Sequence, residues 1–220
     1  MMMVSGLRRF TFTTHITSSV GWVGAVITFL ALAVIGLTSE DELTVRGAYL
    51  VMAPAAWFVL VPLAHASLLS GIALSLGTTW GLFRHYWVVL KLLITVFATV
   101  ILLVYMRTFR QMAGVAADPI AELGLVRNPS PVVHAILALI LLVIATGLGI
   151  YKPFGMTSYG SRKQAVRRQA IASAILEPTG SVRSIMSTSA SRWTYFAGLI
   201  TIGIALLFLL LHLTGTAFRH

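Results

Sequence analysis

The sequence predicts an all-α, polytopic membrane protein: a bundle of five transmembrane helices, with a four-helix core, a fifth span and a cytoplasmic N-terminus. Of the 220 residues, 58% are hydrophobic and 10% are charged, and the mean hydropathy is +0.91. Soluble domains carry about 25% charged residues. Five apolar stretches each supply the ~20 residues with which a helix crosses a membrane, and we expect one transmembrane domain over residues 1–220. The stretches cover residues 10–37, 48–76, 87–106, 131–151 and 193–217.

The first span follows Arg8 and Arg9, and the loop after it carries Glu40, Asp41 and Glu42. Its apolar stretch far exceeds the ~7–15 residues of a signal peptide, so we expect the span to be retained. Basic residues concentrate on the cytoplasmic side of membrane proteins. This rule places the N-terminus in the cytoplasm.

The second span contains small residues at four-residue spacing, Ser67, Gly71 and Ser75. Because lipid tails are as apolar as leucine, membrane helices associate through small residues that allow close approach. We therefore expect this face to pack against another helix. Pro62 predicts a kink just before His65, which would open space for a bound group. A proline without functional consequence is the alternative.

The third span contains Lys91, one turn beyond Trp87 and among aliphatic residues. Its ammonium group either pairs with an anionic ligand or extends to the inner membrane surface. The loop that follows, residues 107–130, is predicted to be external, but its arginines fit the charge rule poorly. They are Arg107, Arg110 and Arg127.

The loop after the fourth span, residues 152–192, supports a cytoplasmic position strongly. Against one acid, Glu177, it carries the basic residues Lys152, Arg162, Lys163, Arg167, Arg168, Arg183 and Arg192. Residues 161–176 place charge early and Ala and Ile late, which suits a helix lying along the inner surface, where basic residues meet anionic lipid headgroups. A solvated basic linker is the alternative. Because the basic residues gather in loops beside spans, we expect no nucleic-acid partner.

Histidines are the most informative polar residues of the chain. On the predicted topology His15, His65 and His85 form an inner set, and His134, His212 and His220 form an outer set. An imidazole in hydrocarbon costs free energy unless it has a ligand, a partner or water. These positions are therefore candidates for function.

His15, Ser19 and Trp22 fall on one face of the first span, where Gly21 and Gly24 let a flat molecule or another helix come close. A histidine above a small, aromatic-backed face suits a haem ligand. We therefore regard His15 as a candidate metal ligand and Trp22 as part of a cofactor site. The alternative is a histidine hydrogen-bonded to a neighbouring helix.

His65 lies well inside the second span, about 16 Å from its cytoplasmic end. It is a candidate second ligand for the same cofactor, or else a neutral histidine bonded to a carbonyl that Pro62 frees. His15 and Lys91 lie at similar inner depth on the predicted topology. One molecule with an acidic group and a metal could therefore contact both.

The outer side offers a second candidate metal site, with His134, His212, Met52 and Met106. Imidazole with thioether suits Cu(I), and two imidazoles suit haem b or Zn(II). Ordinary packing of methionines at helix ends is the alternative.

Several other chemistries lack the residues they need. Cysteine is absent, which excludes disulfides, thiolate metal sites, iron–sulfur clusters and thiol catalysis. Every acidic residue lies in a predicted loop and no G-x-S-x-G turn occurs, so serine–histidine–acid catalysis has no support. Phosphate loops and carboxylate pairs are likewise missing from the spans.

Three stretches of the chain resemble a known group: His15 followed by residues 21–25 (GWVGA), residues 80–92 (WGLFRHYWVVLKL) and residues 151–157 (YKPFGMT). They are similar to an uncharacterised family of bacterial, mostly actinobacterial, integral membrane proteins. That family is grouped with the CopD-like superfamily, which includes copper-resistance D-type proteins and the HemJ type of protoporphyrinogen oxidase. The likeness covers roughly the first 160 residues, and the likeness to the HemJ type covers two short stretches.

This resemblance implies a bundle built on four helices in the bacterial plasma membrane. In HemJ-type proteins a first-span histidine and a third-span lysine are essential, and haem b is bound in the bundle. The matching residues here are His15, as a haem ligand, and Lys91, as a catalytic residue. The chain departs from the HemJ type in its fifth span, its long basic loop and its outer histidines. Protoporphyrinogen oxidation itself therefore does not carry over, and no Met- or His-rich motif indicates copper uptake.

Three hypotheses follow. The first is a protein that binds haem b or a related tetrapyrrole near its inner face through His15, with Lys91 pairing to a propionate, and acts as an oxidoreductase in electron transfer or in tetrapyrrole handling. The second is a copper-handling or transport protein that uses the outer His and Met residues. The third is a cofactor-free accessory subunit whose basic loop docks on a larger membrane complex or on a second copy of the chain.

Overall fold

The computed structural model describes residues 3–78, 81–152 and 155–176. This part of the chain is helical, and four of its helical segments are long and apolar enough to cross a membrane. The all-α class is therefore confirmed, and the four segments indicate a multi-pass membrane protein. The predicted fifth span, residues 193–217, lies outside the described residues, as do His212 and His220.

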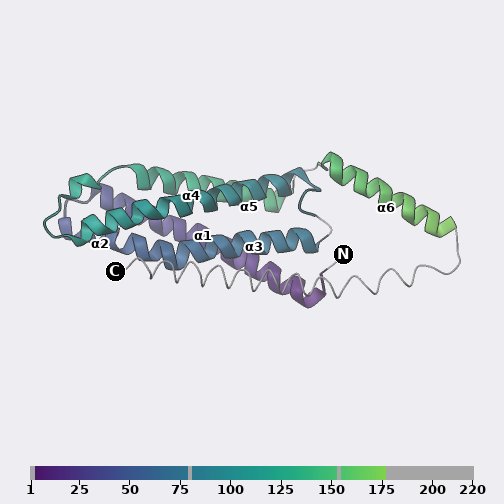
Figure 1. Cartoon of the computed structure of the whole chain (residues 1–220), viewed down its shortest axis with the longest axis horizontal. Helices are drawn as coiled ribbons and strands as arrows, with labels where there is room; N and C mark the ends of the chain where they lie inside the picture. The colour runs from purple at the N-terminus through teal and green to yellow at the C-terminus, as the bar shows by residue number, and fades with distance from the viewer. Residues whose placement is uncertain (1–2, 79–80, 153–154, 177–220) are drawn as a thin grey trace.

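The segments follow one another as long antiparallel helices, which Figure 1 shows lying alongside one another, with α6 extending from one end of the bundle. The second span consists of three contiguous pieces, α2, η1 and α3. The elements are α1 (Ser5–Thr38), α2 (Glu42–Ala55), the π-helical turn η1 (Ala56–Leu60), α3 (Val61–Gly77), α4 (Tyr86–Ala117), the 3-10 turn η2 (Leu123–Leu125), α5 (Ser130–Tyr151) and α6 (Ser158–Leu176).

Helix α4 extends well past the predicted span of residues 87–106, so the prediction of a loop directly after that span was wrong. Arg107 and Arg110 lie on the helix and are exposed, whereas Phe109 and Met112 are buried in the bundle. The extension is amphipathic rather than uniformly apolar, which is typical of a helix that leaves the hydrocarbon while still packing on its neighbours. A search for long apolar stretches does not detect such a continuation.

The second span begins with an N-terminal cap that Asp41 provides. Oδ2 of Asp41 accepts hydrogen bonds from the Thr44 hydroxyl and, at 3.0 Å, from the Thr44 backbone N–H. Both bonds favour the charged carboxylate and lower the pKa of Asp41 from its ordinary value. The negative charge also complements the helix dipole at this end.

A π-helical turn interrupts the second span directly before Pro62. The backbone N–H of Val61 donates to Ala56 O, which is the i to i−5 pattern of a π-helix. Proline has no N–H to donate and disturbs the regular hydrogen-bond ladder, so the wider turn accommodates it. The chain thus adapts to Pro62 on the N-terminal side of the proline, whereas His65 lies on its C-terminal side.

All four spans contribute to the core, and Tyr49 is its largest fully buried side chain. The Tyr49 hydroxyl donates a 3.0 Å hydrogen bond to Gly36 O on α1. A Cβ atom added at Gly36 would lie 2.7 Å from the Tyr49 ring. Glycine at this position therefore allows the two helices to pack closely.

Gly36→Ala is expected to destabilise the protein by roughly 1–3 kcal/mol, because the buried Tyr49 ring must move to admit the methyl group. Thermal unfolding of the purified protein in detergent measures the loss. Gly24→Ala is the matched control on the same helix, since a Cβ there meets nothing within 4 Å. Equal unfolding temperatures for the two variants would contradict the close contact.

Two arginines cap helix ends at the α1–α2 end of the bundle. Arg127 donates from its guanidinium to Gly36 O and Ser39 O, where α1 ends. Arg46 pairs with Glu42 at 2.6 Å and also reaches the end of α4. Its main-chain acceptors there are the carbonyl oxygens of Val115, Ala116, Asp118, Pro119 and Ala121.

Helix α6 covers residues 161–176, for which a surface helix and a solvated basic linker were both open, and it begins slightly earlier. Thr157 precedes it: its hydroxyl donates to Phe83 O and accepts from the Gly160 N–H at 3.1 Å. The start of α6 is thereby fixed to the turn before α4. Its described side chains are almost all exposed, with basic and apolar residues following one another along the helix.

A candidate ligand-binding cavity around His15 and Lys91

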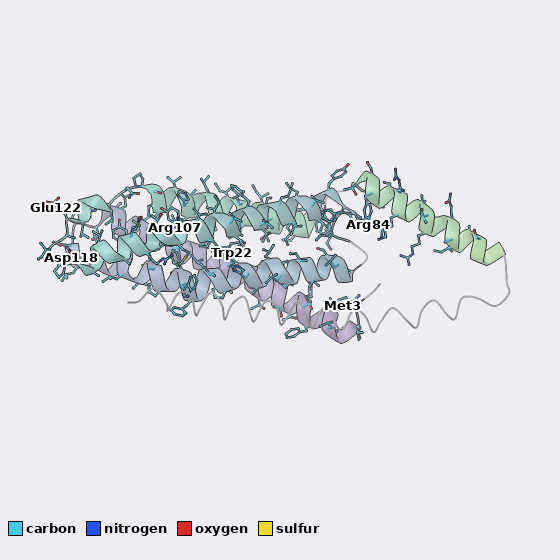
Figure 2. All side chains as sticks on the ribbon, in the orientation of Figure 1. Met3, Trp22, Arg84, Arg107, Asp118 and Glu122 are labelled. Atoms are coloured by element: carbon cyan, nitrogen blue, oxygen red, sulfur yellow. The ribbon has the colours of Figure 1, made fainter. Side chains whose placement is uncertain are left out.

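A cavity of about 660 Å³ opens at the end of the bundle where α1 begins. Its volume lies in the range of roughly 300–1,000 Å³ typical of small-molecule sites. Figure 2 places Met3, which lines the cavity, and Arg84 toward this end of the bundle, and Asp118 and Glu122 at the opposite end. Four helices contribute to its walls: α1, α3, α4 and α5.

His15 lies on the cavity wall with its ring orientation fixed by α3. Its Nδ1 lies 3.0 Å from Ser67 O and 3.1 Å from the hydroxyl oxygen of Ser70. A carbonyl oxygen can only accept, so Nδ1 carries the proton and donates. Nε2 of the neutral ring is therefore left with a lone pair, which is the form that binds a metal or accepts a hydrogen bond.

Lys91 reaches the same wall from α4. Its Nζ lies 3.4 Å from His15 Nε2 and is the donor that faces this lone pair. Thr95, one turn further along α4, donates to Lys91 O at 2.8 Å and also lines the cavity. The structure thus brings together the two residues that the sequence placed at similar depth.

Two glycines leave space for the side chains of His15 and Lys91. A Cβ atom added at Gly71 would lie 3.1 Å from Cε1 of His15, and one added at Gly149 would lie 3.1 Å from Lys91 Nζ. Both distances are tighter than ordinary van der Waals contact. Larger residues at these positions would push His15 or Lys91 out of its present place.

The small-residue face of the second span packs against α1, as predicted. Its Ser67 hydroxyl and that of Ser19 are hydrogen-bonded across the two helices at 2.8 Å. Such interhelical bonds between small polar residues hold membrane helices together. They also fix the position of the carbonyl that orients His15.

The cavity is strongly cationic. Its basic lining residues are Arg8, Arg9, Lys91 and Lys152, and no acidic residue lines it. The acids of the described part of the chain lie at the other end of the bundle, in the α1–α2 turn and between α4 and α5: Glu40, Asp41, Glu42, Asp118 and Glu122. The remaining walls are mainly apolar, with Phe12, Leu68, Leu74, Trp87 and Leu92 among them. This combination suits an anionic molecule with a large apolar body.

Two other predicted residues lie away from this cavity. Trp22 is buried in the core and lines a second cavity further along the bundle. His65 lines neither cavity, and its Nδ1 lies 2.8 Å from Val61 O, one turn earlier on its own helix. The structure therefore does not bring Trp22 or His65 to His15.

The structure brings the residues of the predicted outer metal site only partly together. His134 and Met52 line the second cavity, while Met106 is buried in the core beside it. The fourth candidate, His212, lies outside the described residues. Across residues 3–78, 81–152 and 155–176, no group of three His, Cys, Asp or Glu side chains is placed to hold a metal ion.

Sequence reasoning missed several residues that line the cavity or contact His15 and Lys91. Arg8, Arg9 and Lys152 were interpreted as signals of orientation, and the structure places them in the cavity wall. Ser70 and Gly149 drew no functional interpretation, although they contact His15 and Lys91. A glycine near the inner end of a span opposite a lysine is the signal that could have pointed to this site.

Comparisons of the chain with protein-family profiles, with curated proteins and with solved structures find no match.

Proposed function

We propose that this protein binds haem b or a related tetrapyrrole in the cavity at the start of α1 and acts in electron transfer or tetrapyrrole handling. One observation carries the proposal: an imidazole lone pair and an ammonium group lie 3.4 Å apart on the wall of a cationic cavity that no acid lines. A lysine inside a membrane bundle is costly without a partner, so a ligand carboxylate is the counterion that such a site calls for.

The residues present fit a tetrapyrrole in three respects. His15 Nε2 would be a suitable ligand for the iron, because the hydrogen bond of Nδ1 to Ser67 O fixes the tautomer of the ring. Lys91 would turn from Nε2 of His15 to pair with one propionate, and Arg8 and Arg9 would attract a second one. Phe12 and the other apolar walls exclude water from the macrocycle.

Haem, when bound, would supply a one-electron carrier. In this proposal Lys91 also serves as the catalytic residue, because its amine can hold or release a proton beside the ligand. The resemblance of the first and third spans to HemJ-type proteins supports the same two residues, His15 and Lys91. It also supports a place in the bacterial plasma membrane.

The proposal includes an orientation for the bundle. The N-terminus and α6 lie in the cytoplasm, α6 runs along the anionic inner surface, and residues 193–217 form a fifth span that takes the C-terminus outside. The distribution of charge supports this, since the basic cavity end carries the excess of Arg and Lys while the described acids lie at the other end.

The test is an absorption spectrum of the full chain purified after expression with haem supply. We expect a Soret band for the wild type, a loss of more than about tenfold in bound haem for His15→Ala, and a smaller loss for Lys91→Met, which keeps the ligand but removes the charge. His65→Ala is the matched control, because His65 is a membrane histidine that lines neither cavity.

Two results would overturn the proposal. One is a wild-type protein without a Soret band under these conditions. The other is equal haem content in His15→Ala and wild type, which would place the cofactor elsewhere. Circular dichroism of each variant separates a lost ligand from a lost fold.

A further inference from the structure

A second cavity of about 330 Å³ lies between α1, α4 and α5 and shares no lining residue with the first. Aromatic rings form much of its wall: Trp22, Phe29, Phe97, Tyr105 and Phe109. Neither lysine, arginine nor an acid lines it. Flat rings prefer offset or edge contacts with other rings, so the wall is suited to an uncharged ring compound.

One side of this cavity lies at the surface of the bundle that faces lipid. Phe97 on α4 and Leu137 and Ile140 on α5 line the cavity while each leaves half or more of its surface exposed. In a transmembrane bundle such exposed apolar side chains contact acyl chains. A molecule dissolved in the membrane can therefore reach the cavity from the side, between α4 and α5.

His134 gives the cavity a hydrogen-bond acceptor. Its Nδ1 lies 2.8 Å from Ser130 O, so Nδ1 carries the proton of the neutral ring. Nε2 then holds a lone pair, and no hydrogen bond within the described residues reaches it. The Tyr105 ring, 4.3 Å away between ring centroids, holds the imidazole in place, and its hydroxyl is hydrogen-bonded to Ser130 at 2.8 Å.

Trp22 adds a donor from the opposite helix. Its side chain is 3% exposed and lines the cavity, and its indole N–H has no hydrogen-bond partner in the described part of the chain. A ligand oxygen that can accept would satisfy this group.

We infer that the second cavity binds a lipid-soluble hydroquinone, a ring whose hydroxyl group donates to Nε2 of His134 and whose body packs among the aromatic side chains. The inference does not depend on the tetrapyrrole site, because the two cavities have no residue in common. Copper is the alternative occupant, because His134 and Met52 both line the cavity.

The test compares two forms of one probe, decylubiquinol and decylubiquinone, by calorimetric titration of the full chain in detergent at one fixed pH. The quinone has the same ring but no hydroxyl hydrogen. We expect the quinol to bind roughly three- to tenfold more tightly, the value of one hydrogen bond. His134→Phe keeps a ring against Tyr105 and should abolish this preference, while the control His65→Phe should retain it.

A second variant keeps the test decisive if His134→Phe fails to fold. Ala138→Phe fills the cavity from α5 and should remove binding of both forms. The inference is overturned if the wild type binds neither form, if it does not distinguish them, or if His134→Phe leaves the preference unchanged. The inference is also overturned, in favour of a metal site, if the wild type contains one copper ion per chain and the His134→Phe variant contains none.

Discussion

Arg46→Met is expected to destabilise the bundle by roughly 2–4 kcal/mol, because it removes a charged donor that serves several main-chain acceptors at once. The Arg46 side chain is only 12% exposed and donates to main-chain carbonyls where α4 ends, the shortest of these bonds being 2.6 Å to Asp118 O. The last carbonyls of a helix have no partner within it. Methionine has a similar length but cannot donate, so these acceptors lose their partner. Thermal unfolding in detergent should show a fall in Tm of roughly 5–15 °C.

Arg110→Met is the control for this prediction. Arg110 lies on the same helix α4, is exposed and makes no side-chain hydrogen bond within the described residues. Both variants lose one positive charge and the same kind of side chain. If both lose equal stability, net charge rather than the capping of α4 is the cause, and the role given to Arg46 is contradicted.

The arginine caps explain part of a conflict in the charge pattern of the sequence, because Arg127, one of the three arginines that fit the charge rule poorly, caps α1. Arg46 and Arg127 lie on the predicted outer side, where the positive-inside rule expects few basic residues. The structure uses Arg127 to cap α1 and Arg46 to cap α4. Cations at a helix C-terminus also interact favourably with the helix dipole. Such tertiary roles cannot be recognised in a count of charges along loops.

The four helical segments could be predicted because hydrocarbon imposes a simple rule: every backbone group must be bonded within the segment, and the side chains must be apolar. That rule predicts that a span exists, but it does not predict how far its helix continues beyond the membrane. Helix α4 continues to Ala117 because alternate faces of its last turns meet the core and the water. The π-helical turn before Pro62 is an adaptation of the backbone to a proline, which the periodicity of apolar residues does not encode.

The candidate site could be predicted in part. His15 and Lys91 were expected at similar depth, and depth follows directly from position along a span and the 1.5 Å rise per residue. Trp22 illustrates the limit of this reasoning. It shares a helical face with His15, but seven residues separate the two by about 10 Å along the axis. A shared face therefore did not mean a shared cavity.

Cysteine labelling should show an all-or-none difference between the two ends of the bundle. The natural chain has no cysteine, so Glu40→Cys in the α1–α2 turn and Ser161→Cys on α6 each introduce a single thiol at an exposed position. In the proposed orientation a membrane-impermeant maleimide labels Glu40→Cys in intact cells and labels Ser161→Cys only after the cells are opened, because the basic segment is retained in the cytoplasm.

The two ways in which this experiment can fail have different meanings. The reverse pattern, with Ser161→Cys labelled from outside, would contradict the orientation but leave the bundle intact, and the His15 cavity would then open on the outer face. Labelling of both thiols from one side would contradict the proposed bundle, because three membrane crossings separate residues 40 and 161: α2 to α3, α4 and α5. An odd number of crossings requires opposite sides, whichever way the bundle is inserted.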